Sequence, residues 1–358
     1  MIHVFLGTKA QYIKTAPLLR LLDARGVPYR LIDSGQHAAL SVGLREELGV
    51  RAPDHLLAAG RDITSIPQAA AWAARLAWRL LDRRRLRAEV FGGRGGVCVV
   101  HGDTPSTLLS ALMARRAGLR VAHLEAGLRS GHLLHPFPEE LIRVLVMRVS
   151  GLLFAPDEEA VANLRRMRLR GEIVPLPGNT VAESLAHDLG DTAGAPGTGP
   201  VVVTMHRVEN LNRRERVQQF VDVVCRVAAT RPVRFVVHGP TAETLRRRGH
   251  VGRLRDAGVE LVPLVRHGEF VTMLRAAPFV ITDGGSIQEE CALLGVPTLL
   301  WRAATERADG IGTNVVLGSY DDRVIESFLA DPERRRVPPA SGQHRPSEIV
   351  LERLLQEP

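Results

Sequence analysis

Residues 99–148 read VVHGDTPSTLLSALMARRAGLRVAHLEAGLRSGHLLHPFPEELIRVLVMR, and this stretch decides the fold. An apolar strand over residues 97–100 runs into HGDT, a helix follows, and a second strand over residues 119–123 runs into EAG. Strands that alternate with helices at this spacing predict a parallel α/β sheet. Ligands bind beyond the carboxyl ends of the strands in such sheets, so Asp103 and Glu125 are expected to face one crevice.

A third acid belongs to the same stretch. Glu139 follows the segment Pro136-Phe137-Pro138 and opens the next helix, whose amino end has a partial positive charge. Three carboxylates at one sheet edge are costly for folding and useful for proton transfer. The sequence therefore predicts an acid/base site.

Several phrases, in this order, resemble one known family, the non-hydrolysing UDP-N-acetylglucosamine 2-epimerases. They cover nearly the whole chain and read GTKAQYIK, HGDT, HLEAGLRSG, HPFPEE, FAPDEEAVANL, PGNTVAESL, TMHRVENL, TDGGSIQEECALLGVP and TERADGIGTN. The resemblance implies the GT-B fold, in which two Rossmann-like parallel-sheet domains face each other across a cleft.

Two domains are expected from the length of 358 residues and from the repeated strand and helix patterns. We place an N-terminal domain with the carboxylates at residues 1–175 and a UDP-binding domain at residues 176–339. By resemblance, the last helix, within residues 340–358, packs back on the first domain. The composition shift over residues 190–199, which read GDTAGAPGTG, predicts a loop or hinge.

The amino-acid composition is typical of a globular protein and gives no sign of a membrane or nucleic-acid partner. Hydrophobic residues make up 45%, charged residues 24% and aromatic residues 4%, as in soluble globular proteins. We expect a cytoplasmic protein without a membrane partner, because the sequence shows neither a signal peptide nor an apolar run of about 18 residues. The net charge of +8 comes from arginine. The basic run at residues 83–87 lacks interleaved aromatics, so we expect the solvated end of a long helix and no nucleic-acid partner.

The amino-terminal strand, residues 2–6, breaks at Gly7-Thr8 and leads into a helix that starts near Lys9. A strand, a glycine turn and a helix amino end form an anion site, and Lys9 and Lys14, the only lysines of the chain, fit a phosphate-bearing ligand. A surface turn with solvated lysines is the alternative. The resemblance implies a catalytic Lys14. Lys9, Ala10 and Gln11 stand where the family usually has Arg, Pro and Glu.

The second half of the chain predicts a nucleotide site. His206 and Arg207 follow a strand over residues 200–204, and Gly284-Gly285-Ser286 opens a helix whose backbone N–H groups could approach a diphosphate. The family usually has serine first and two glycines after it. By resemblance Glu290 accepts from the ribose hydroxyls, and the residues expected to bind UDP are Lys9, Arg143, Arg207, Gly284, Gly285, Ser286, Glu290 and Arg307.

A second, allosteric molecule of sugar nucleotide binds some members of the family. The positions that match its contacts here are Gln36, Arg61 and His238, whereas Ala39 stands where a second glutamine is usual. Family members are commonly homodimers, and this is the expected assembly.

The resemblance implies a reaction: UDP is eliminated across carbons 1 and 2 to give 2-acetamidoglucal, and is then added back with protonation from the opposite face. Asp103, Glu125 and Glu139 would exchange the proton, while Lys14 and His206 would handle the leaving-group charge. No metal and no cofactor are expected, because the acids lack a matching His/Cys set and cationic groups can hold the diphosphate.

Four other functions remain open from the sequence. A hydrolysing enzyme would release UDP and N-acetylmannosamine, and an epimerase for another UDP-sugar would fit the departures at Lys9, Gln11, Ile142 and Val144. A GT-B glycosyltransferase would leave three first-domain carboxylates unexplained. A silent sugar-nucleotide sensor should have lost its acids, which are all present.

Overall fold

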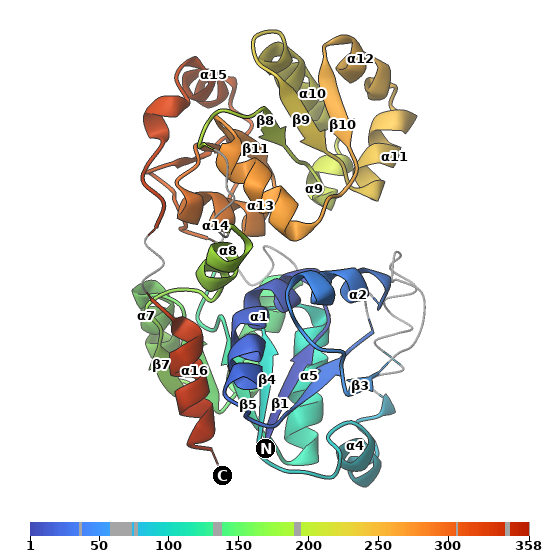
Figure 1. The fold of residues 1–358 in the computed structure, drawn as a ribbon, viewed down its shortest axis with the longest axis vertical. Coiled ribbons are helices and arrows are strands. Elements are labelled where there is room, and N and C mark those ends of the chain that lie inside the picture. Colours follow the sequence, from blue (N-terminus) through green and yellow to red (C-terminus); the bar gives the residue numbers. More distant parts are fainter. Residues whose placement is uncertain are drawn as a thin grey trace. The chain divides into compact units, whose positions relative to one another are not determined.

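The computed structural model describes residues 1–35, 38–57, 74, 78–131, 138–189, 195–305, 307–340 and 344–357. Contacts between its elements divide the chain into two compact units (Figure 1). Unit 1 comprises Met1–Ser184 with Gly342–Pro358, and unit 2 comprises Leu185–Ser341. No helix within the described ranges is long and apolar enough to cross a membrane.

Unit 1 is built on a seven-stranded parallel sheet with the strand order β3-β2-β1-β4-β5-β6-β7. The order reverses beside β1 and β4, and in parallel α/β sheets such a switch point is where ligands bind. The strands are β1 (Ile2–Leu6), β2 (Tyr29–Asp33), β3 (His55–Leu56), β4 (Val97–His101), β5 (Arg120–Leu124), β6 (Leu152–Ala155) and β7 (Glu172–Pro175). The helices are α1 (Lys9–Ala24), α2 (Ala38–Glu47), α4 (Arg83–Glu89), α5 (Pro105–Ala117), α6 (Glu139–Val149), α7 (Glu158–Met167), α8 (Val181–Leu189), which continues into unit 2, and α16 (Pro346–Leu355).

Local sequence explains how these elements begin and end. Every residue of β1 and β4 is buried, and both strands are accordingly apolar except for one histidine each, His3 and His101. Thr104 caps α5 in a reciprocal capping box with Thr107, Pro105 occupies the first helical turn, and Gly118 ends the helix in the left-handed conformation. The loop between β4 and α5, which includes Asp103, is therefore short and fixed at both ends.

The basic run at residues 83–87 corrects one prediction. It opens α4, because the Asp82 side chain accepts a hydrogen bond from the backbone of Arg85 and caps the helix there. The predicted place of this run, at the end of a long helix, is therefore wrong. Most of the residues before it, 58–73 and 75–77, lie outside the described part of the chain.

Unit 2 repeats the design with a six-stranded parallel sheet in the order β10-β9-β8-β11-β12-β13. Its strands are β8 (Val201–Val203), β9 (Val233–Val236), β10 (Val259–Val262), β11 (Val280–Thr282), β12 (Thr298–Leu300) and β13 (Val315–Leu317). Its helices are α9 (Val208–Leu211), α10 (Arg214–Ala228), α11 (Gly239–Arg247), α12 (His250–Asp256), α13 (His267–Ala276), α14 (Gly285–Leu294), α15 (Asp322–Ala330) and the short 3-10 helix η1 (Glu333–Arg335). A core that includes Phe220, Phe235 and Trp301 fills one face of this sheet.

The chain returns to unit 1 at its end. Helix α16 packs against α1, and Val350, Leu351 and Leu354 join the core of that unit (Figure 1). The division falls at Ser184, somewhat after the border expected near residue 175. The reason is that the hydroxyls of Thr180 and Ser184 donate hydrogen bonds to backbone carbonyls of α1.

Candidate active site

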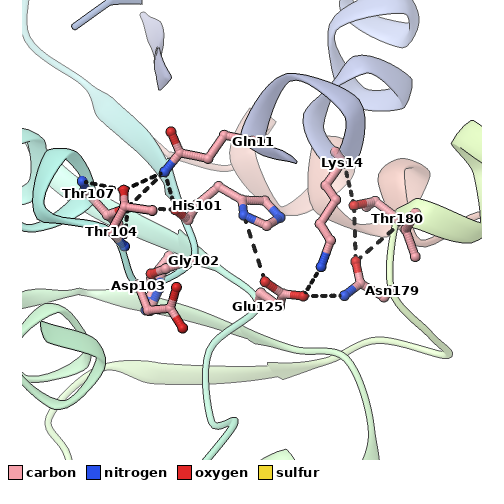
Figure 2. A network of polar contacts seen from close by, with 12 residues as sticks. Gln11, Lys14, His101, Gly102, Asp103, Thr104, Thr107, Glu125, Asn179 and Thr180 are labelled. Atoms are coloured by element: carbon pink, nitrogen blue, oxygen red, sulfur yellow. Dashed lines mark hydrogen bonds and ion pairs between the residues drawn. The ribbon is translucent and has the colours of Figure 1, made fainter. Parts of the chain in front are cut away.

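Glu125 is the centre of a polar cluster at the edge of the unit 1 sheet (Figure 2). Lys14 of α1 donates to Glu125 Oε1, and Asn179 Nδ2 donates to the same oxygen at 2.6 Å. The other oxygen, Oε2, lies 3.9 Å from His101 Nδ1. Lys14 and Glu125 are both buried, so their charges interact at low dielectric, where pairing is nearly obligatory.

The backbone of Glu125 is itself unusual. Its φ of 64° lies in the left-handed region, which a residue other than glycine rarely adopts. Such a conformation costs about 1–3 kcal/mol and persists where the surroundings require it. Here it directs the chain out of β5 so that the carboxylate meets Lys14 and Asn179.

Asp103 lies at the same edge, because β4 and β5 pair in parallel with His101 opposite Leu124. Its carboxylate pairs with Arg143 of α6. Arg143 in turn donates to Glu140 Oε2 at 2.7 Å, and Arg129 donates to the other oxygen of Glu140. Glu140 is completely buried. Burial would raise the pKa of this carboxyl, but the bonds from Arg129, the Ser130 backbone and Arg143 outweigh it and hold the pKa below its usual value.

Gln11 joins the two turns that follow β1 and β4 (Figure 2). Its Oε1 accepts hydrogen bonds from the backbone of Gly7 at 2.7 Å and of Thr8 at 3.1 Å. Its Nε2 donates to the His101 carbonyl and to Thr107 Oγ1, both at 2.8 Å. An amide can accept on one side and donate on the other, whereas the ionised glutamate usual in the family could only accept. Gln11 therefore suits this position chemically.

Glu139 and Lys9 are the first residues of α6 and α1, as the sequence predicted. One carboxylate oxygen of Glu139, Oε2, is buried and has no hydrogen-bond partner within the described part of the chain. A buried acceptor in this condition is a candidate for binding a ligand. The segment before it, residues 132–137, lies outside the described residues.

In unit 2 the buried Asp283 holds the segment after β8. Its carboxylate accepts hydrogen bonds from the backbone N–H groups of His206 and Arg207, both at 2.9 Å, and from Asn210 Nδ2 at 2.9 Å. Tyr320 donates its hydroxyl proton to Asn210 Oδ1 at 2.7 Å. These contacts fix the position of His206 at the carboxyl end of β8.

The His206 ring lies against the start of α14. A Cβ atom added at Gly284 would lie 2.8 Å from His206 Cε1, so any larger residue there would have to displace the ring. Burial lowers the pKa of His206, the Asp283 charge opposes this, and Arg207 and Arg302 lower it further, so the imidazole is neutral at pH 7.

The remaining predicted residues lie as follows. The His238 ring is 5.0 Å from the His206 ring, measured between centroids. Arg207 pairs with Glu209 at 3.4 Å, and Arg307 pairs with Glu289 at 3.0 Å. Of the three predicted allosteric residues, only His238 belongs to the described part of the chain. Gln36 and Arg61 lie outside it.

Glu290 is buried on α14 and belongs to a second cluster. His267 Nε2 lies 3.2 Å from Glu290 Oε1, and His267 Nδ1 lies 2.7 Å from Asp188 Oδ2. Burial alone would lower the pKa of His267, but the two carboxylates raise it to about 9. His267 is therefore an imidazolium at neutral pH. In the described ranges no group of three or more His, Cys, Asp or Glu side chains is arranged to hold a metal ion.

Comparison with known proteins identifies the family. Its model, described as UDP-N-acetylglucosamine 2-epimerase, matches residues 20–337. The chain is 28% identical over 344 residues to the UDP-N-acetylglucosamine 2-epimerase of Methanocaldococcus jannaschii, covering 91% of this chain and 90% of that protein. It is also 28% identical over 339 residues, 91% and 90% of the two chains, to the UDP-2,3-diacetamido-2,3-dideoxy-D-glucuronate 2-epimerase of Pseudomonas aeruginosa.

Comparison with a solved structure supports the same family. The crystal structure of the M. jannaschii enzyme in complex with UDP-GlcNAc and UDP superposes with a TM-score of 0.83 at 26% identity, over 99% of each chain. The chain therefore belongs to the UDP-N-acetylglucosamine 2-epimerase family. The predicted fold class, two Rossmann-like parallel-sheet domains of the GT-B type, is confirmed. The expectation that the two sheets face each other across a cleft stays a prediction.

Several residues of these clusters were missed by sequence reasoning. Glu140 could have been found, because it follows Glu139 directly and lies one helical turn before Arg143. Asn179 lies in the family-like segment PGNTVAESL, but the sequence alone gave it no role. Asp188, His267 and Tyr320 gave no signal, since each meets its partner only through the fold.

Proposed function

We propose that the protein epimerises carbon 2 of UDP-N-acetylglucosamine reversibly to give UDP-N-acetylmannosamine, by elimination and re-addition of UDP through 2-acetamidoglucal. The observation that carries the proposal is the buried Glu125 carboxylate, which is held by Lys14 and Asn179 at the carboxyl end of β5. A fixed carboxylate next to a fixed cation suits a reaction in which a proton moves as a diphosphate leaves.

Three carboxylates form the acid/base group in this proposal. Asp103 and Glu125 follow paired strands at one sheet edge, and each is paired with a cation, Arg143 and Lys14 respectively. Glu139 contributes a buried carboxylate oxygen without a protein partner among the described residues. Fixed positions matter because proton transfer requires the carboxylate within hydrogen-bond reach of carbon 2 in the bound sugar.

The diphosphate is bound by the amino end of α14 and by cationic side chains. Gly284 is the N-cap of that helix, and Gly285 and Ser286 begin its first turn, where backbone N–H groups without helical partners favour an anion. The neutral His206 beside Gly284 can donate a hydrogen bond to the leaving group. Lys9, Arg143, Arg207 and Arg307 are the further proposed contacts, and Glu290 is the proposed acceptor for ribose.

Re-addition of UDP, instead of release, distinguishes this proposal from the hydrolysing alternative. Incubation of the purified protein with UDP-N-acetylglucosamine, followed by anion-exchange chromatography, separates the outcomes. The proposal predicts an equilibrium mixture of two UDP-sugars with no stoichiometric UDP. Steady accumulation of UDP and N-acetylmannosamine would support the hydrolysing enzyme in its place. We also expect a homodimer, which light scattering would test.

A second candidate substrate comes from the named relatives. The relatives named for UDP-N-acetylglucosamine and for UDP-2,3-diacetamido-2,3-dideoxy-D-glucuronate share the same identity with this chain, 28%. The ratio of kcat/KM for the two sugar nucleotides decides between them. We expect UDP-N-acetylglucosamine to be preferred by at least about tenfold, a difference of roughly 1.4 kcal/mol in transition-state binding.

A further inference from the structure

Glu290, the proposed acceptor for ribose, is one of three ionisable side chains in unit 2 that form a continuous buried chain. His267, at the start of α13, lies between Asp188 near the end of α8 and Glu290 on α14. The side chains of Asp188 and His267 are each 3% exposed, and that of Glu290 is 6% exposed. The three residues come from three separate helices, so the fold has brought them together.

The position of His267 is unfavourable for a cation in two respects. It is the first residue of α13, where the partial positive charge of a helix amino end disfavours a second positive charge. It is also buried, which disfavours any charge. The two carboxylates therefore supply the stabilisation. A buried ion pair of this kind often adds little to stability compared with apolar residues, so orientation of the side chains is a better explanation for the cluster than stability.

Donor and acceptor counts show what the cluster does to Glu290. An imidazolium has two N–H donors and no acceptor. With one N–H directed at Asp188 and the other at Glu290, the ring is fixed in the plane of both contacts. Glu290 Oε1 faces one of these N–H groups and accepts from it, and the carboxylate has further acceptor sites for other donors. Such a group is suited to vicinal hydroxyls, each of which can donate one proton.

We propose that His267, held by Asp188, is a positioning residue that orients Glu290 to accept hydrogen bonds from the ribose hydroxyls of the UDP moiety. The inference rests on the proposed function, because it assumes a uridine nucleotide at the amino end of α14. It assigns to Asp188 and His267 a role in nucleotide recognition without direct contact to the nucleotide.

The test compares the affinity for UDP with the affinity for 2′-deoxy-UDP and 3′-deoxy-UDP by titration calorimetry. In the wild-type protein, loss of a hydroxyl should weaken binding on the order of 10-fold to 100-fold, as for a hydrogen bond to a charged group. The ratio of the affinity for UDP to the affinity for a deoxy analogue measures this loss. In His267→Leu the ratio should fall to within about 2-fold. His267→Gln, which keeps one N–H donor, should recover part of the ratio.

Further variants complete the design. Glu290→Gln should lower the ratio as His267→Leu does, and the double variant should lower it no further, because both changes act through one carboxylate. Should His267→Leu fail to fold, Asp188→Asn serves in its place and should lower the ratio severalfold. His250→Gln is the matched control, a buried histidine of the same unit on α12, and should leave the ratio unchanged.

The outcomes separate this inference from the proposed function. Weaker binding of UDP and both deoxy analogues by the same factor in His267→Leu and in Asp188→Asn would indicate a structural role and overturn the inference alone. The inference is also overturned if both variants keep the wild-type ratio. Failure of the wild-type protein to bind UDP would instead overturn the proposed function, and the inference with it.

Discussion

Lys14 and Glu125 form a buried ion pair between α1 and the end of β5, and Asn179 donates to the same carboxylate oxygen. The only other lysine of the chain, Lys9, begins the same helix. A buried pair of opposite charges costs desolvation free energy that apolar residues would not. The arrangement is therefore better explained by chemistry than by stability.

Replacement of Glu125 by glutamine should remove proton transfer and keep the shape of the side chain. We expect kcat to fall by about 10²- to 10⁴-fold, the usual contribution of a general acid or base. The measurement is the steady-state rate of epimer formation, with thermal unfolding as the check on folding. Arg85→Gln, which removes an exposed pair with Glu89, is the control and should keep full activity. A Glu125→Gln protein with near wild-type kcat would contradict the proposed role.

Glu140→Gln should destabilise the protein, although Glu140 was absent from the predicted site. The change leaves Arg129 and Arg143 with a buried neutral partner, and breaking a buried pair typically costs about 3–5 kcal/mol. The free energy of unfolding in urea measures this loss. Activity should fall as well, because Arg143 also pairs with Asp103. A loss below about 1 kcal/mol would show that the two arginines find other partners.

Gly284→Ala should displace the His206 ring. The added Cβ would lie 2.8 Å from His206 Cε1, closer than side chains tolerate. We expect kcat/KM to fall at least about tenfold, as for the loss of one oriented hydrogen-bond donor. Gly252→Ala is the matched control: a Cβ there meets nothing within 4 Å and the residue lies inside α12, so stability should rise by about 0.5–1 kcal/mol with unchanged activity. Full activity in Gly284→Ala would mean that His206 has no part in the reaction.

The His267 cluster predicts a pH dependence of stability. The pKa of His267 is raised from its ordinary value of 6.5 to about 9, so the folded state binds the proton more tightly than the unfolded state. The stabilisation is complete below about pH 6.5 and is lost as the pH rises through about 9. The groups that face the ring are Asp188 from α8 and Glu290 from α14.

The difference in unfolding free energy between wild type and His267→Gln isolates this effect from other titrating groups. It should be largest near pH 6 and shrink by roughly 3 kcal/mol by pH 10, from about 1.4 kcal/mol per pKa unit. Urea titrations at pH 6, 7, 8, 9 and 10 measure it. A difference that stays constant across this range would refute a cationic His267.

The sequence predicted the two sheets and the turns after β1, β4, β5, β8 and β11 because strand, turn and helix signals are local. Apolar runs and caps such as Thr104 and Gly118 need no tertiary information. The pairing of side chains was not predictable in the same way. Gln11 looked like a departure from the family, and only the fold shows that its amide meets the His101 carbonyl across the sheet edge.

Charge partners were the least predictable feature. The sequence did not predict the pairing of Arg143 with Asp103 and Glu140, and its predicted contact with UDP stays a prediction. Each carboxylate of the Asp103, Glu125 and Glu140 group is paired with lysine or arginine, and only the pair of Glu140 with Arg143, one helical turn apart, has a spacing that indicates it.

The central claim is that the proton on carbon 2 leaves and returns, and proton NMR in deuterated water tests it most directly. The purified protein is incubated with UDP-N-acetylglucosamine, and the anomeric signals and the carbon 2 proton are followed over time. The account predicts UDP-N-acetylmannosamine with deuterium at carbon 2, and loss of this exchange in Glu125→Gln. A UDP-sugar mixture that keeps the original proton at carbon 2, or a bound substrate that never exchanges, would contradict it.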